Sequence, residues 1–258
     1  MDQATVKSIE QYESACPTIA IQHKGIKLRY SLPNGTALWR VQTLLTKEPC
    51  TIEWLESIEP DSVMLDVGAN VGMYSVFAAL ITRTRVYAFE PESQNYALLC
   101  RNIVHNGLAT QVTAYCAALS DSQKFSVIHL SEFKTGGSCH SFDAAVNFNL
   151  KERKTPFIQG CYSTTVDQLV AEGAMPVPNY IKIDVDGFEH KVTAGARQTL
   201  KDPAVKSLII EINPHLAEHR DIIAYLAEYG FNYDPAQVAR AARTEGAFSG
   251  VGEYVFRR

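Results

Sequence analysis

The sequence predicts an α/β fold in which a mainly parallel sheet carries helices on both faces. Short apolar runs rich in β-branched residues alternate with segments of helical spacing along most of the 258 residues. Polar residues and glycines follow several of these runs directly, which is typical of the carboxyl ends of buried parallel strands. A chain of this length can bury one sizeable core, so a single globular unit is expected.

The chain before the first core strand has a different pattern. Residues 1–60 are expected to form an N-terminal cap, and residues 61–258 the main domain. Residues 26–30 and 37–41 alternate in character on either side of Pro33-Asn34-Gly35. Two such runs around a turn predict a β-hairpin.

A helix is expected at residues 49–58, where apolar side chains recur at helical spacing behind Pro49. This helix would lie just before the first core strand and could close over a ligand. Glu48 and Thr51 are therefore candidate ligand contacts, and helix capping explains both residues equally well.

Residues 63–81 contain the central motif. An apolar run ends in Asp66, and a turn spaced by Gly68, Asn70 and Gly72 leads into an amphipathic segment. This order predicts a strand, a tight turn and a helix, with a ligand at the strand end. A dinucleotide turn has the pattern G-x-G-x-x-G, whereas this one carries a carboxylate and an amide. Asp66 would repel a diphosphate but suits a cationic ligand such as S-adenosylmethionine, which carries a sulfonium and an α-amino group.

Glu90 directly follows the second predicted strand, residues 85–89. An acid at this position suits a bidentate hydrogen bond to ribose hydroxyls. A helix over residues 93–106 and a third strand over residues 112–116 continue the alternation.

The middle of the chain is less regular. Residues 125–130 have the pattern of an extra strand, and residues 131–162 then lose periodicity. A long irregular segment inside a compact domain is usually functional or disordered. A substrate lid is the favoured interpretation, and a plain surface loop is the alternative.

The alternation then resumes to the end of the chain. Further core strands are expected at residues 180–184 and 207–212, with a helix to about Leu200 between them. An amphipathic helix at residues 222–229 and a closing strand at residues 253–256 follow.

The composition argues against several classes of partner. A net charge of −4 and a pI near 6.0 argue against nucleic acid, because binding phosphates needs a basic face. The sequence starts without a signal-peptide pattern and has no apolar run long enough to span a membrane. The six cysteines include no C-x-x-C pair, which predicts free thiols. A cytoplasmic protein without a membrane partner is expected.

Three motifs together resemble the FkbM family of S-adenosylmethionine-dependent methyltransferases. They are the turn from Asp66 to Gly72, the pair Glu90-Pro91, and the run I-K-I-D-V-D-G-F-E that starts at Ile181. The last motif is the most specific, and Asp186 stands where such proteins often have a glutamate. The resemblance implies a seven-stranded, Rossmann-like class I methyltransferase fold. It also implies O-methylation of a small hydroxylated molecule, often a sugar or a secondary metabolite.

The resemblance also implies roles for individual residues. Asp66, Gly68, Asn70 and Gly72 would line the methionine and sulfonium region, and Glu90 would bind the ribose. Ser120 or Asp121 would meet the adenine edge, and Asp184 would lie beside the transferring methyl group.

Methyl transfer to a hydroxyl needs alignment and removal of a proton, so a general base or a metal is expected. Asp184 is the first choice for the base, and Glu189 and His190 follow in the next helical turn. Asp186 is expected to have an orienting or structural role. His140 and His215 are further base candidates.

A metal is the alternative to a protein base. Glu211 and Asn213 end the fifth core strand and are expected to face the same rim as Asp184. Three such oxygen ligands could hold Mg²⁺, although oxygens at strand ends are common without a metal.

Three rival functions stay open at this point. An N-methyltransferase would use the same cofactor on an amine. A nicotinamide-dependent oxidoreductase is disfavoured by Asp66 and by the missing glycine at Asn70. A non-catalytic protein could bind the cofactor without turnover. The acceptor and the oligomeric state cannot be read from the sequence.

Overall fold

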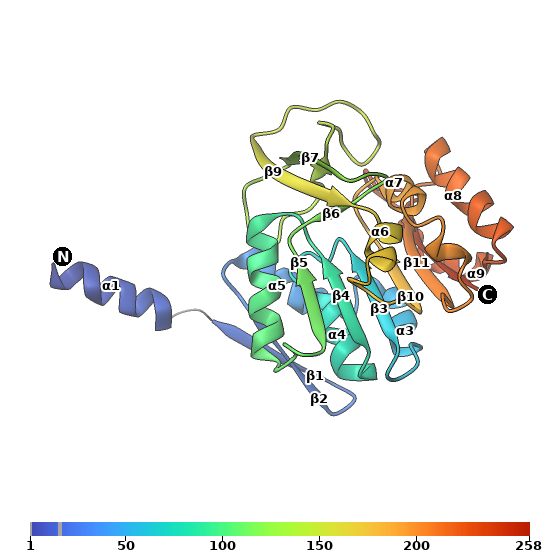
Figure 1. Ribbon diagram of the computed structural model, residues 1–258. Coiled ribbons are helices and arrows are strands. Elements are labelled where there is room, and N and C mark those ends of the chain that lie inside the picture. Colours follow the sequence, from blue (N-terminus) through green and yellow to red (C-terminus); the bar gives the residue numbers. More distant parts are fainter. Residues whose placement is uncertain (1, 15–16) are drawn as a thin grey trace.

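The computed structural model describes residues 2–14 and 17–258 (Figure 1). Its helices are α1 (Gln3–Ser14), α2 (Gly35–Thr43), α3 (Pro49–Glu56), α4 (Met73–Thr82), α5 (Ser93–His105), α6 (Val166–Ala171), α7 (Glu189–Ala194), α8 (Ala217–Glu228) and α9 (Pro235–Ala241), with a 3₁₀ turn at Thr199–Lys201. Its strands are β1 (Thr18–His23), β2 (Ile26–Ser31), β3 (Val63–Val67), β4 (Arg85–Phe89), β5 (Val112–Tyr115), β6 (Ala118–Leu119), β7 (Lys124–Leu130), β8 (Ser141–Phe142), β9 (Phe157–Thr164), β10 (Tyr180–Ile183), β11 (Ser207–Ile212), β12 (Asn232–Tyr233) and β13 (Gly252–Arg257).

The main sheet of the described chain has seven strands in the order β12-β13-β11-β10-β3-β4-β5. The strands from β11 to β5 are parallel to one another, and β13 runs antiparallel to both β11 and β12. The chain proceeds from β3 outwards in one direction and returns to β10 on the other side. The strand order therefore reverses between β3 and β10, where open α/β sheets bind ligands. The predicted seven-stranded, mainly parallel sheet is confirmed.

Both faces of this sheet are buried, as its nearly continuous apolar strands require. Met64 and Val86 pack on the face covered by α3, α4 and α5. Leu65 and Tyr87, the next residues along, pack on the opposite face with α6, α7 and α8. Successive side chains point to opposite faces of a strand, so each strand serves two cores. The predicted double winding is confirmed.

A second sheet, β6-β9-β7-β8, lies beyond the ends of β4 and β5 at the top of Figure 1. The predicted extra strand corresponds to β7. The prediction that residues 131–162 are wholly irregular is wrong, because β8 and most of β9 fall in this range. β9 pairs along the whole of β7, from Lys124 to Leu130. Phe157, Ile158 and Tyr162 of β9 are exposed apolar residues, so this strand lacks the alternation that sequence patterns detect.

The N-terminal hairpin lies earlier in the sequence than predicted. It consists of β1 and β2, joined by Lys24-Gly25 in the left-handed conformation that tight hairpin turns require. Residues 37–41 form part of α2 and not a strand. The Asn34 side chain accepts a hydrogen bond from the backbone N–H of Ala37, so Asn34 caps a helix here and does not close a hairpin.

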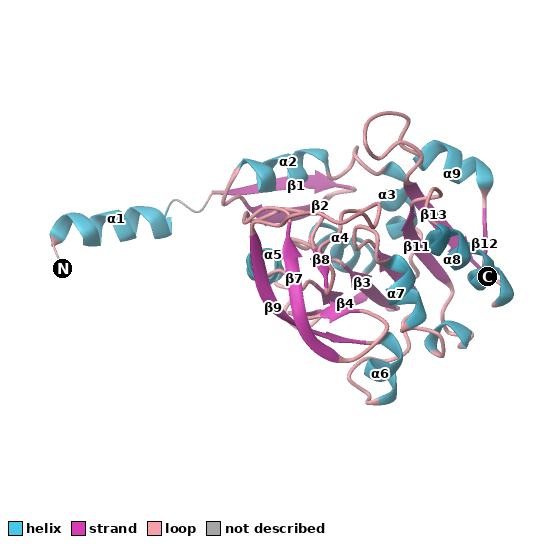
Figure 2. Cartoon of the chain, turned by 90° about the horizontal axis from the view of Figure 1, so that it is seen from above, coloured by secondary structure: helices cyan, strands magenta, loops and turns pink. Residues whose placement is uncertain are grey.

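The N-terminal segment packs into the main core. Leu28, Tyr30 and Val41 share a hydrophobic cluster with Val76 and Phe77 of α4. The division at residue 60 stays a prediction. Helix α1 projects away from the rest of the chain (Figures 1 and 2).

Several smaller differences have local causes. Helix α7 ends at Ala194 and not near residue 200, and a separate 3₁₀ turn forms at Thr199–Lys201. Helix α8 begins at Ala217, earlier than predicted, and α1, β1 and α9 were not predicted. No helix among the described residues is long and apolar enough to cross a membrane. The five cysteines in this part of the chain are free, and Cys16 lies outside it.

Gly72 allows α4 and α5 to approach closely, and its substitution tests this packing. Gly72 has φ +80°, and an added Cβ would collide with Leu99 of α5. Gly72→Ala should lower the free energy of unfolding by about 2–5 kcal/mol, the sum of left-handed strain and overpacking. Gly107→Ala is the matched control, since Gly107 has φ +68° and open space around it. It should cost about 1–2 kcal/mol in chemical denaturation. Equal losses would contradict the packing role.

Candidate active site

A cavity of about 350 Å³ lies at the carboxyl ends of β3, β4, β10 and β11, and a smaller one of about 60 Å³ adjoins it. Gly68, Asn70 and Asp184 line both cavities. Parallel strands bring their carboxyl ends to one edge, so motifs far apart in the sequence meet here. The cavity lies at the point where the strand order reverses.

Gly68 brings two strand ends together. It has φ +77°, and a Cβ at this position would collide with the backbone carbonyl of Asp184. Only glycine combines this conformation with this approach. The turn after β3 therefore packs directly against the end of β10.

The predicted ribose acid and the central turn contact each other. Both oxygens of Glu90 accept backbone hydrogen bonds, from the N–H of Asn70 at 2.8 Å and from that of Glu92 at 2.9 Å. Asn70 is left-handed, with φ +50°, and this conformation turns its N–H towards the carboxylate. Burial of the side chain raises the pKa of Glu90 to about 7. Glu90 lines the main cavity.

Lys182 lines the smaller cavity and lies between two carboxylates. Its Nζ is 3.2 Å from Oδ2 of Asp184 and 3.8 Å from Oδ1 of Asp66. Asp66 is fully buried outside the cavity lining, and its Oδ2 accepts a 2.5 Å hydrogen bond from Ser75. Burial would lower the pKa of Lys182, but the carboxylates of Asp184, Asp66 and Glu48 outweigh it and raise that pKa. Lys182 therefore stays charged despite its burial.

Glu48 and Thr51, the candidate contacts near α3, have different surroundings. Glu48 lines the smaller cavity, accepts a hydrogen bond from Tyr74 Oη at 2.7 Å and pairs with Lys47 at 2.5 Å. Thr51 is buried outside both linings. Gly72 also lies outside them and packs against Leu99.

Asp184 belongs to a cluster of three carboxylates. Oxygens of Asp184, Asp186 and Glu211 lie within 4.8 Å of one another. Each has a partner: Lys182 for Asp184, the Cys139 N–H at 2.7 Å for Asp186, and Arg243 at 2.7 Å for Glu211. Burial and the charge of Asp184 raise the pKa of Asp186 to about 6.

The predicted metal set is not assembled in full. Asn213 is buried outside the cavity lining, with its Nδ2 donating to Asn149 and its Oδ1 accepting from the His215 N–H. Asp186 is closer to Asp184 and Glu211 than sequence reasoning expected. With an arginine already on Glu211, the donor set does not fit Mg²⁺ well. The metal site stays a prediction.

Glu189 stabilises the motif turn and does not line the cavity. Its two carboxylate oxygens accept hydrogen bonds from the backbone N–H groups of Val185 and Gly187, at 2.8 and 3.0 Å. Oε2 also lies 3.2 Å from Nε2 of His219, which joins this turn to α8. His190 lies beside this group and outside the cavity lining.

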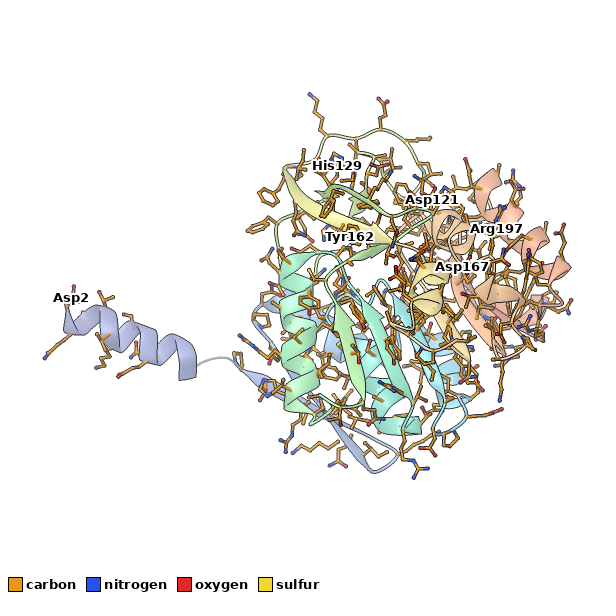
Figure 3. The ribbon with its side chains drawn as sticks, viewed as in Figure 1. Asp2, Asp121, His129, Tyr162, Asp167 and Arg197 are labelled. Carbon is orange, nitrogen blue, oxygen red and sulfur yellow. The ribbon has the colours of Figure 1, made fainter. Side chains whose placement is uncertain are left out.

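The remaining candidates divide between the cavity and the surface. Ser120 lines the cavity, among the apolar residues Phe89, Leu119 and Phe142. Asp121, labelled in Figure 3, is exposed and outside the lining. His140 lines the cavity, whereas His215 is exposed and outside it.

Sequence reasoning missed several lining residues. Arg243 and Phe248 come from the segment between α9 and β13, which carries no motif. Trp39 and Lys47 come from the region of α2, whose structure was predicted incorrectly. Asn95 was detectable in principle, because it lies in the first turn of α5, directly behind Glu90-Pro91.

A family comparison agrees with this arrangement. The model of the methyltransferase FkbM domain matches residues 66–233, well over half of the chain. The chain belongs to the FkbM methyltransferase family. The matched range begins at the central turn and includes the second strand acid and the I-K-I-D-V-D-G-F-E motif, so the resemblance found in the sequence is confirmed.

Individual relatives are distant. The chain is 27% identical over 212 residues to the hexuronic acid methyltransferase AglP of Haloferax volcanii, covering 82% of this chain and 80% of the relative. It is 26% identical to the 31-O-demethyl-FK506 methyltransferase FkbM of Streptomyces tacrolimicus, covering 83% and 92%. A crystal structure of methyltransferase FkbM from Methylobacillus flagellatus is similar with a TM-score of 0.49 and 16% identity. That match covers 88% of this chain and 56% of the other.

The role of the buried Lys182 in this FkbM-family site can be tested by measuring the stability of a variant. Lys182→Met should lower the free energy of unfolding by about 3–5 kcal/mol, because it leaves buried carboxylates without their cation. Lys206→Met is the matched control, since Lys206 pairs with Glu59 at the exposed surface, and it should leave the free energy of unfolding close to the wild-type value. Restoration of stability by adding Asp66→Asn to Lys182→Met would support the charge explanation. A loss equal to the control would contradict it.

Lys182→Met should also change how the free energy of unfolding falls at low pH. Burial would raise the pKa of Asp184, but Lys182 and Lys47 outweigh it and hold that pKa below its ordinary value. The stability from this carboxylate is thus present above about pH 4 and lost as the pH falls further. Denaturation midpoints measured against pH should show a smaller acid loss in Lys182→Met.

Proposed function

We propose that this FkbM-family protein is an S-adenosylmethionine-dependent methyltransferase that methylates a hydroxyl of a small molecule, a sugar or a secondary metabolite. The observation that carries the proposal is the placement of Glu90 and Asp184 on opposite sides of the Gly68 turn, in one cavity. One acid suits a ribose, and the other suits the region of the cationic centre.

The lining residues fit the parts of this cofactor. Phe89, Leu119 and Phe142 provide an apolar surface for an adenine, next to Glu90 for the ribose hydroxyls. Glu48 and Asp184 provide negative charge, and Lys47 and Lys182 provide positive charge, around the smaller cavity. Such a mixture suits the ammonium and carboxylate of an amino acid.

The bound cofactor supplies a methyl group on a sulfonium, and the protein must align an acceptor oxygen with it. Lys182 contacts Oδ2 of Asp184, which leaves Oδ1 as the atom that we expect to take the hydroxyl proton. Asp186 is the second choice, because its raised pKa, about 6, is closer to the pH at which a general base works best. Glu189 and His190 are then positioning residues, and no step needs a metal.

The relatives support the choice of acceptor class. One is described as acting on a hexuronic acid and another on 31-O-demethyl-FK506. The first is a sugar acid, and the second name denotes a compound that lacks an O-methyl group. Family membership also favours a methyltransferase over the nicotinamide-dependent alternative. An amine acceptor is the alternative within the same chemistry.

Calorimetric titration with S-adenosylhomocysteine and then NAD⁺ is the first test. S-adenosylhomocysteine is the demethylated product, so it probes the site without turnover. Micromolar affinity that is lost in Asp184→Ala supports the proposal and justifies acceptor screening with hydroxyl and amine compounds. NAD⁺ binding without S-adenosylhomocysteine binding would overturn it.

Glu90 should make this affinity depend on pH. An ionised carboxylate accepts hydrogen bonds from both ribose hydroxyls, so binding favours ionised Glu90, whose pKa burial raises to about 7. Affinity for S-adenosylhomocysteine should therefore rise severalfold from about pH 6 to about pH 8. In Glu90→Gln it should be roughly tenfold weaker at the higher pH and independent of pH. Glu59→Gln, at the surface, should retain the wild-type profile, and a pH-dependent Glu90→Gln variant would refute the assignment.

A further inference from the structure

His140 is the cavity-lining residue whose hydrogen bonds are incomplete. It lies between Cys139 and β8, and all three of Cys139, His140 and Phe142 line the main cavity. Its Nε2 is buried and has no hydrogen-bond partner among the described residues. A buried polar atom without a partner costs free energy, so this atom, on a residue that lines the cavity, points to a partner that the described residues do not supply.

The other ring nitrogen determines what Nε2 can do. Nδ1 lies 3.2 Å from the backbone nitrogen of Ser131, which can only donate. The Ser131 hydroxyl, 3.3 Å from the same Nδ1, already donates to the carbonyl of Ser138. Nδ1 is therefore the acceptor, and the proton of the neutral ring is on Nε2.

The surroundings keep this ring neutral. Burial lowers the pKa of His140, and the charges of Arg153 and Arg40 act in the same direction against those of Glu92 and Glu132. A neutral ring with its Nδ1 occupied has no free lone pair to take a proton. The base role considered for His140 in the sequence therefore does not suit its geometry.

Few groups near the expected adenosine position have a donor without a partner. The backbone N–H of Ser120, at the expected adenine edge, donates to the Thr164 carbonyl at 2.9 Å. The Asn95 amide donates to the Gly137 carbonyl at 3.1 Å, and the Cys139 N–H to Asp186. Each of these groups already donates within the protein, whereas Nε2 of His140 has no hydrogen-bond partner among the described residues.

We propose that His140 is a cofactor-binding residue whose Nε2–H donates a hydrogen bond to the adenosine part of S-adenosylmethionine. This inference rests on the proposed function. Adenine ring nitrogens and ribose oxygens are both acceptors that match this donor. Phe142, two residues further on, provides the apolar surface beside it, so one short segment would hold both features of an adenosine site.

The test is calorimetry with S-adenosylhomocysteine and with 5′-methylthioadenosine, which lacks the amino-acid end. His140→Ala should weaken both ligands by the same factor, roughly 3- to 10-fold, the effect of one hydrogen bond. His140→Gln, whose amide can still donate, should stay within about twofold of the wild type. His215→Ala is the control, because His215 is exposed and outside the cavity.

The outcomes separate this inference from the proposed function. Wild-type binding that is unchanged in His140→Ala, or a loss confined to S-adenosylhomocysteine, would overturn the inference alone. A wild type that binds neither ligand would overturn the proposed function together with the inference. Nitrogen-15 NMR of the ligand-free protein gives a second readout that needs no ligand. It should show the Nε2–H tautomer for His140, and an Nδ1–H tautomer would overturn the inference.

Discussion

The buried ammonium of Lys182 is the interaction on which the site depends. Lys182 and Asp66 are directly paired in the register of β10 and β3, so the charge is located where the strand order reverses. Taking a lysine and two carboxylates out of water is costly, and well-packed apolar residues would often be as stable. The arrangement is best explained by its effect on Asp184, which lines both cavities and has the ammonium of Lys182 3.2 Å from its carboxylate.

The three neighbouring carboxylates differ in protonation because their partners differ. Lys182 and Lys47 overcome burial and hold the pKa of Asp184 low, whereas burial raises the pKa of Asp186 to about 6. Burial, followed by the charge of Asp184, raises the pKa of Glu211 well above its ordinary value despite Arg243. Adjacent titratable groups whose pKa values are pushed apart are a recurring feature of acid–base sites. The cluster thus holds one carboxylate with a lowered pKa, Asp184, next to two whose pKa values are raised, Asp186 and Glu211.

Local patterns were sufficient for the main sheet but not for its additions. The strands β3, β4 and β10 are mostly apolar runs with polar residues in or directly after them, and this pattern is independent of tertiary context. The N-terminal hairpin was misplaced because Pro33-Asn34-Gly35 suits either a turn or a helix start, and only packing decides between them. β9 is defined by its partner β7, so its boundaries could not be read locally. Arg243 reaches Glu211 from a segment without a motif, and only the folded chain brings them together.

The structure of residues 136–137 also depends on contacts that the sequence does not reveal. Gly137 offers its carbonyl to two amides, Asn70 Nδ2 at 2.8 Å and Asn95 Nδ2 at 3.1 Å, while the Gly136 N–H donates to Asn95 Oδ1 at 2.7 Å. Arg40 of α2 holds the same stretch through the Gly136 carbonyl. A segment without periodicity is thus ordered by side chains of the central turn and of α5. The hydrogen bond from Asn70 to Gly137 links the turn after β3 to the segment that leads into Cys139 and His140. The asparagine at the position where a dinucleotide motif has glycine therefore has a structural role: Asn70 joins the turn after β3 to residues 136–137.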